Sequence, residues 1–302
     1  MADAHDPIPL APLESAQVFP VPALPGRVKV EADTHALFDA LGGALMGAAL
    51  DAVGRRGVFH LALSGGSTPY PFYMSLMTDP RWRAMPWPTT HLWIVDERCV
   101  PFDNERSNWR QIHEIFADHS GIPEAHLHPI DATAPDACER YEAELRGALG
   151  GERGDTVGGT VGGTRGDTVG GTRGDTVGGT RGSAAHDRET QGRLDFALLG
   201  MGDNGHTASL FPETAVLDER ERWIAPCDGP TVTPPKRITM TYPVLNATRT
   251  VAVLVVGAAK AAMLHRVATG HETARELPIK GIRPESGELL WFLDCAAAGA
   301  AR

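Results

Sequence analysis

The chain has 302 residues, 42% of them hydrophobic, and a formal net charge of −10. A chain of this size can bury one large core, and its acidity disfavours nucleic acid and anionic membranes, so we expect neither as a partner. Residues 1–25 lack the basic and apolar segments of a secretion signal, and no apolar run reaches the roughly 18 residues of a membrane helix. We therefore predict a cytoplasmic protein with a flexible tail over residues 1–25.

Beyond the tail, short apolar runs alternate with stretches of helical periodicity. The runs predict strands at 58–63, 91–95, 196–199, 250–256 and 289–293. The periodic stretches predict helices at 32–53, 69–77, 108–117, 138–149 and 259–268. Continuous apolar strands separated by helices are typical of an α/β fold with a mostly parallel sheet and helices on both faces. We expect a single domain over residues 26–302.

One segment interrupts this alternation. The unit GDTVGGTR recurs from Gly154 to Gly182, and residues 166–173 and 174–181 are identical copies. Short repeats can build a β-solenoid. However, these units are rich in glycine and contain one valine each, which is too little apolar surface to offset the entropy of ordering. We interpret 150–190 as a disordered insertion without a chemical role.

In parallel sheets ligands bind beyond the carboxyl ends of the strands, so the residues that follow each strand are candidates for the site. The first predicted strand is followed by Ser64, Gly65, Gly66, Ser67 and Thr68. Paired glycines let backbone N–H groups approach a ligand, Ser67 or Thr68 can cap the next helix, and a helix N-terminus favours phosphate. The alternative is an ordinary tight turn.

Two charged segments are further candidates. Asp96 and Arg98 follow the second strand, where a carboxylate can take a proton or orient a histidine and an arginine can hold a phosphate. Lys236 and Arg237 follow a pair of prolines and can close over a phosphate. Solvated surface charges are the alternative in both cases.

The third strand end carries the strongest signal for chemistry. It reads GMGDNGHTAS and contains a GxGxxG pattern from Gly200 to Gly205. The pattern suggests dinucleotide binding, but the acidic residue expected at the end of a following strand is not convincing. His206 can deprotonate water near neutral pH. Ser209 is not in the elbow motif of a nucleophilic serine, and the other histidines lack the spacing of a metal site.

The segments LALSGGSTP, VDERCVP, GMGDNGHTASLFP and PPKRIT, in this order, resemble the 6-phosphogluconolactonase family. The resemblance runs from about residue 59 to the last predicted strand. It implies a single Rossmann-like α/β domain of the sugar-phosphate isomerase type. It also implies hydrolysis of 6-phospho-D-glucono-1,5-lactone to 6-phospho-D-gluconate in the oxidative pentose phosphate pathway, with neither metal nor organic cofactor.

The resemblance also assigns roles to residues. It places the catalytic histidine on His206 and the strand-end acid on Asp96. The residues expected to bind substrate or phosphate are Ser64, Gly65, Gly66, Ser67, Thr68, Arg98, Gly202, Asn204, Lys236 and Arg237. We expect the phosphate on the 64–68 loop between Arg98 and Lys236, with Asp96 orienting His206 or stabilising its cation.

Two positions deserve comparison with the family pattern. The family usually has Asp-Gly-His where this chain has Asn204-Gly205-His206, so Asn204 would have to orient the histidine through a neutral hydrogen bond. Related glucosamine-6-phosphate deaminases carry a glutamate where this chain has Phe211, and a phenyl ring cannot transfer a proton. A deaminase-like isomerase and a non-catalytic sugar-phosphate sensor are the alternatives. We expect a monomer or a weak homodimer.

Overall fold

The computed structural model describes residues 22–150 and 192–299. Its centre is a seven-stranded parallel sheet in the order β1-β10-β9-β6-β2-β3-β5. The strands are β1 (Arg27–Glu31), β2 (Phe59–Leu63), β3 (Thr90–Ile94), β5 (Leu127–His128), β6 (Phe196–Gly200), β9 (Thr250–Val255) and β10 (Glu288–Asp294). The central strands are almost wholly buried apolar residues, as expected for a sheet covered on both faces.

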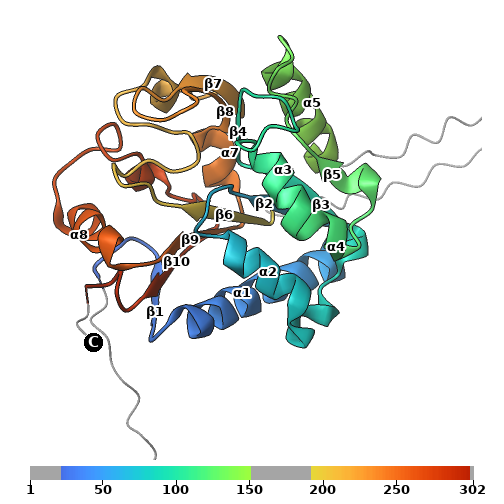
Figure 1. Cartoon of the computed structure of the whole chain (residues 1–302), viewed down its shortest axis with the longest axis horizontal. Helices are drawn as coiled ribbons and strands as arrows, with labels where there is room; N and C mark the ends of the chain where they lie inside the picture. The colour runs from blue at the N-terminus through green and yellow to red at the C-terminus, as the bar shows by residue number, and fades with distance from the viewer. Residues whose placement is uncertain (1–21, 151–191, 300–302) are drawn as a thin grey trace, which may run out of the picture.

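A small antiparallel sheet lies beside the large one (Figure 1). It consists of β4 (Asp96–Arg98), β8 (Lys236–Met240) and β7 (Ile224–Asp228), in that order. Val95 connects the two sheets: its N–H donates to Leu63 O of the large sheet, and its carbonyl accepts from Met240 N of the small one. The residues that follow β3 are therefore fixed in a second sheet instead of a free loop.

Helices cover the sheet. They are α1 (Thr34–Arg56), α2 (Tyr70–Thr78), α3 (Asn108–Ile112), α4 (Asp118–Ser120), α5 (Ala137–Gly150), α7 (Tyr242–Ala247) and α8 (Ala261–Thr269), with a π-helical turn (His113–Ala117) between α3 and α4. In Figure 1, α1 and α2 lie on one side of the central strands, and α7 lies with the small sheet on the other. The predicted fold class, a mostly parallel sheet with helices on both faces, is confirmed.

Helix α1 corrects one expectation. Its 23 residues have the length and apolar composition of a membrane span, although no such run was expected from the sequence. The helix packs against β1, β2 and β10, and its buried side chains include Leu37, Leu41 and Leu45. These contacts are those of a core helix on a sheet.

The five predicted strands and five predicted helices each correspond to an element, with ends shifted by a few residues. Strands β1, β4, β5, β7 and β8 and helix α7 were not expected. Strands β4 and β5 have only three and two residues, and β1, with the sequence RVKVE, lacks a continuous apolar run. Residues 1–21 and 151–191 are outside the described part of the chain, so the predicted tail and insertion stay predictions.

The strand order locates a binding region. From β2 the chain proceeds to β3 on one side, and β6 then returns to the other side of β2. Connections that leave in opposite directions open a crevice at the carboxyl ends of the two strands. The segments after β2, β6 and β9 meet there, because these three strands are neighbours in the sheet.

Candidate active site

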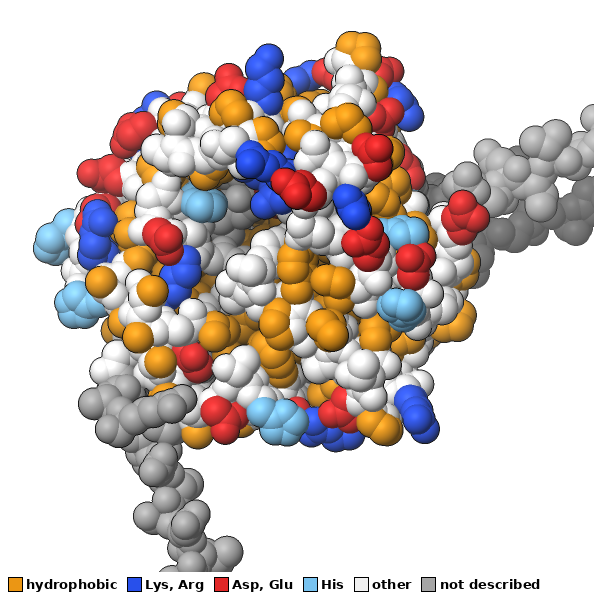
Figure 2. Space-filling view, in the orientation of Figure 1, with side chains coloured by type: hydrophobic (Ala, Val, Ile, Leu, Met, Phe, Trp, Pro, Cys, Tyr) orange, Lys and Arg blue, Asp and Glu red, His pale blue; other side chains and the backbone are white. Residues whose placement is uncertain are grey.

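A cavity of about 270 Å³ lies at this crevice. Figure 2 shows a hollow near the middle of this face, with Lys and Arg side chains at its rim and a histidine beside it. The lining includes every expected site residue except Asn204 and Lys236. It comprises Ser64–Pro69, Asp96, Arg98, Asn108, Gly200–Gly202, His206–Ala208, Phe211, Val232, Arg237, Leu254–Val256 and Lys260.

Asn204 fixes the ring of His206. Its Oδ1 accepts a hydrogen bond from the backbone N–H of His206 at 3.2 Å and lies 2.6 Å from His206 Nδ1. Because the backbone N–H can only donate, the atom facing it must be the amide oxygen. The same oxygen can only accept, so Nδ1 carries the proton in the neutral ring. Nε2 is then left with a free lone pair, the form required of a base.

The surroundings of His206 favour this neutral form. Burial lowers the pKa of His206, and the charges of Lys260 and Arg237 act in the same direction, whereas the charge of Asp96 raises it. The ring packs against Phe211, with centroids 4.8 Å apart. Gly202 makes room for it, since a Cβ there would lie 2.0 Å from His206 Cε1.

Of the two roles expected for Asp96, orienting His206 or stabilising its cation, the hydrogen bonds leave the second. Its buried Oδ2 accepts a 2.6 Å hydrogen bond from Ser209 Oγ, and the backbone N–H of Ser209 donates to Thr239 Oγ1. Asn204, not Asp96, makes the hydrogen bond that orients His206. Asp96 acts on the histidine through its charge, and Ser209 holds that carboxylate.

Strand alternation decides which cations reach the cavity. In the β4–β8 pair Arg98 lies opposite Arg237, and Asp96 lies opposite Thr239. Side chains of opposite residues share a face, so these four lie together while Lys236, one residue along, is on the other face. Arg237 is buried at the cavity, whereas Lys236 is exposed and does not line it. The expected phosphate clamp by Lys236 is therefore not what the structure has.

Lys260 supplies the third cation and was not expected from the sequence. It follows β9, and it lines the cavity. Its Nζ lies 2.5 Å from Asp203 Oδ1. Its position beyond the carboxyl end of a predicted strand is the signal in the sequence that indicates Lys260.

The 64–68 loop lines the cavity as expected, but its side chains have unequal roles. Ser64 Oγ donates to Leu198 O at 2.7 Å and so ties β2 to β6. Gly66 has φ +101°, a conformation that favours glycine, and its N–H donates to Tyr70 Oη. Helix α2 begins at Tyr70 without a side-chain cap, so the expected cap by Ser67 or Thr68 is wrong.

Behind the cavity, Glu97 holds the segment that carries Arg98. Its buried carboxylate accepts hydrogen bonds from the backbone N–H groups of Arg98, Asn108 and Trp109 and from Ser107 Oγ. Burial raises the pKa of Glu97, and these four donors oppose that effect. Asn108 extends the network by donating from Nδ2 to Asp96 O.

Within residues 22–150 and 192–299, no three His, Cys, Asp or Glu side chains are placed to hold a metal ion. Metal independence itself stays a prediction. The chemistry available in the cavity is that of a neutral imidazole, a carboxylate and three cations, a set suited to binding a phosphorylated substrate and activating water.

A family model described as glucosamine-6-phosphate isomerases/6-phosphogluconolactonase matches residues 32–291. The chain belongs to this family. The resemblance of the four sequence motifs is thereby confirmed.

Named members of the family are similar over most of the chain. The 6-phosphogluconolactonase of Rattus norvegicus is 35% identical over 251 residues, covering 81% of this chain and 81% of the rat protein. The GDH/6PGL endoplasmic bifunctional protein of Oryctolagus cuniculus is 32% identical over 250 residues, 83% of this chain but only 27% of that longer protein. The crystal structure of 6-phosphogluconolactonase from Leishmania guyanensis shares the fold, with a TM-score of 0.69 at 22% identity, covering 92% of this chain and 99% of that one.

Proposed function

We propose that the chain is a 6-phosphogluconolactonase. It hydrolyses 6-phospho-D-glucono-1,5-lactone to 6-phospho-D-gluconate in the cytoplasm, as a step of the oxidative pentose phosphate pathway, without a metal or organic cofactor. The names of its relatives support this substrate. The single observation that carries the proposal is the tautomer of His206, whose Nε2 is kept unprotonated by Asn204 beside a cavity lined by cations.

One set of residues binds the phosphate, and another positions the base. Arg98, Arg237 and Lys260 bind the 6-phosphate, together with Ser67 and Thr68, whose hydroxyls line the cavity. This contact places C1 of the lactone near His206. Gly202 and Asn204 act on the base instead of the ligand, by making room for the ring and by fixing it.

The chemical step is general base catalysis. His206 Nε2 takes a proton from a water molecule as its oxygen attacks the lactone carbonyl carbon. Backbone N–H groups of the 65–68 turn or a cation of the cavity stabilise the tetrahedral oxyanion. The bond from C1 to the ring oxygen then breaks, and the imidazolium returns its proton to that oxygen. Asp96 stabilises the transient imidazolium through its charge.

The family also contains glucosamine-6-phosphate isomerases, and Phe211 argues against that activity here. Phe211 packs on the base and lines the cavity. Because a phenyl ring has no ionisable group, it cannot transfer a proton during ring opening. The apolar ring instead keeps water away from one face of His206.

The test is lactone hydrolysis with the lactone generated in situ. We expect wild type to accelerate the decay of the lactone over the buffer blank. In His206→Ala the catalysed rate should fall by a factor on the order of 10²–10⁴. His113→Ala, at a partly exposed histidine outside the cavity, is the matched control and should keep wild-type activity. Unchanged activity of His206→Ala after background subtraction would refute the mechanism. Release of ammonia from glucosamine 6-phosphate, without lactone hydrolysis, would reassign the chain to the isomerases.

A further inference from the structure

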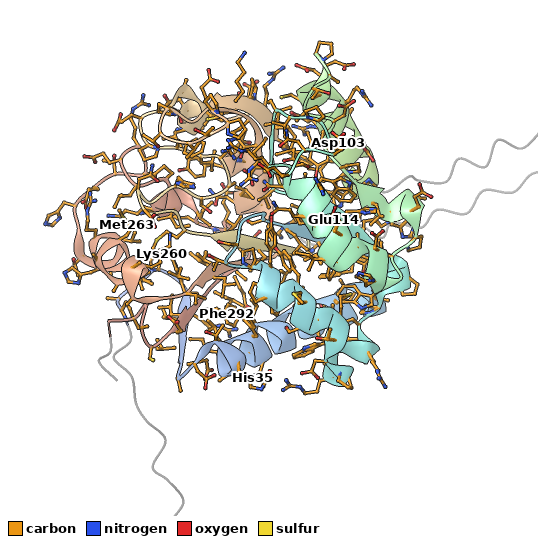
Figure 3. All side chains as sticks on the ribbon, viewed as in Figure 1. His35, Asp103, Glu114, Lys260, Met263 and Phe292 are labelled. Carbon is orange, nitrogen blue, oxygen red and sulfur yellow. The ribbon has the colours of Figure 1, made fainter. Side chains whose placement is uncertain are left out.

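The ammonium group of Lys260 is bound by a carboxylate at the rim of the cavity. Lys260 Nζ lies 2.5 Å from Asp203 Oδ1; the lysine side chain is 20% exposed and the aspartate 88% exposed. Figure 3 shows Lys260 at the beginning of α8, on the side nearer to the central strands. Lys260 lines the cavity and Asp203 does not. The pair thus joins the turn that carries His206 to the segment entering α8.

The two arginines of the cavity are bound differently. Arg98 Nη1 donates to Arg106 O, and Arg237 Nε donates to Pro234 O. Backbone carbonyls carry no net charge. In the described part of the chain, no carboxylate lies within ion-pair distance of either guanidinium, although the charge of nearby Asp96 acts on Arg237. Lys260 is the cavity cation whose charge is already balanced by an ion pair.

We propose that Asp203 competes with the anionic group of the ligand for Lys260. It holds Lys260 in the free protein and shares or releases it when a phosphate enters, so that Asp203 sets the affinity of the cavity for phosphate. This inference rests on the proposed docking of the phosphate on the cavity cations.

The sign of the effect distinguishes this role from a structural one. A carboxylate that competes repels a phosphate dianion and occupies one donor of Lys260, so removing its charge must strengthen phosphate binding. A carboxylate that only positions the lysine must weaken phosphate binding when it is removed. Because Asp203 is exposed, its replacement should disturb folding little.

The first experiment measures binding of inorganic phosphate by calorimetry, which needs no turnover. We expect Asp203→Asn to bind phosphate about threefold or more tightly than wild type. Glu114→Gln removes an equal charge and a similar exposed ion pair, Glu114 with Arg110, outside the cavity, and should match wild type. In a Lys260→Gln background the effect of Asp203→Asn should become smaller, since no lysine is left to be released and only the repulsion between Asp203 and the phosphate remains.

The second experiment follows the phosphorylated lactone and unphosphorylated gluconolactone. Asp203→Asn should lower KM for the phosphorylated lactone by the same factor, with kcat unchanged, and leave KM for the unphosphorylated one unchanged. Phosphate affinity that stays equal or falls in Asp203→Asn overturns the inference. Tighter phosphate binding without lactone hydrolysis by any variant supports the inference and refutes the proposed function, so the two failures are distinguishable.

Discussion

Buried or half-buried histidines occur in two regions around the central sheet, and the two groups differ in what their nitrogens contact. At the carboxyl ends, His206 lines the cavity with Nε2 free. Around β2, β3 and β5 lies a histidine layer formed by His60, His91, His126 and His128. None of these four lines the active-site cavity.

In the histidine layer the ring nitrogens of His60, His91 and His128 contact one another or their neighbours. His91 Nδ1 lies 2.9 Å from His128 Nε2, and His128 Nδ1 lies 2.5 Å from Glu144 Oε1. Trp93 Nε1 donates to His60 Nδ1, and the Trp93 ring stacks on His128 at 3.7 Å. Rings packed in this way stabilise the core and have little freedom to act on a ligand.

Both regions lower histidine pKa values through burial. The pKa of His60 falls to about 3 and that of His91 to about 4, and the pKa of His206 is also lowered. A lowered pKa therefore does not by itself identify a catalytic histidine. What distinguishes His206 is its place in the lining of a cavity that contains cations.

The largest effect we expect is acid destabilisation through the histidine layer. His60 keeps a folded-state pKa of about 3 against 6.5 in the unfolded chain, so the unfolded chain binds the proton first as pH falls. The stability due to neutral His60 is complete above pH 6.5 and declines toward pH 3. By pH 4 the loss is on the order of 3 kcal/mol. Urea unfolding between pH 7 and pH 4 measures it.

The charged and titratable groups around His60 are His91, His128, Arg56 and His126, and they also contribute to this pH dependence. His60→Gln keeps an acceptor for Trp93 but cannot titrate, so its stability should fall less steeply with acid than that of wild type. Parallel pH profiles of the two proteins would contradict the assignment to His60.

The cavity should respond to substitution in binding. Arg237→Gln removes a charge-assisted hydrogen bond to the phosphate and should raise KM roughly 10- to 100-fold. Lys236→Gln, at the neighbouring exposed residue on the other face of β8, should change KM less than twofold. Steady-state kinetics on the two variants checks this, and equal effects would show that strand alternation does not select the binding cation.

The smallest effect concerns the base itself. Asn204→Asp places a carboxylate against Nδ1 of His206 and favours its protonated form, so the pKa of His206 should rise. Because the base acts when neutral, the acid limb of the pH profile of kcat/KM should move to higher pH, by about one unit. An acid limb at the same pH in both proteins would mean that Asn204 does not contact the base during turnover.

The sequence was informative where the local pattern sets the structure. The central strands are continuous apolar runs, and the segments that follow them carry His206, Asp96 and the 64–68 turn. Parallel strands bring such segments to one edge whatever their separation in the chain, so the cavity could be expected from strand ends alone. The repeats and the tail lie outside the described residues, and their predictions are untested.

The sequence was less informative where pairing between distant segments decides the outcome. Whether Lys236 or Arg237 enters the cavity depends on the register of β8 with β4, which neither segment specifies alone. The orienting partner of His206 is two residues away along the turn, whereas the charge of Asp96 reaches it from another sheet. Asn204 is therefore a hydrogen-bond partner of His206, whereas Asp96 acts on His206 through its charge.

The end of α5 at Gly150 lies beside Gly192, which precedes β6. A Cβ at Gly192 would be 2.3 Å from Leu149 O, so the exit from α5 and the approach to β6 meet before any of residues 151–191 is considered. Both ends are at the amino side of β6, away from the cavity. The length of the segment that joins them can therefore change at little cost in loop-closure entropy. The segment between these two residues can thus be replaced by a reporter domain or a short linker without a change to the residues that line the cavity.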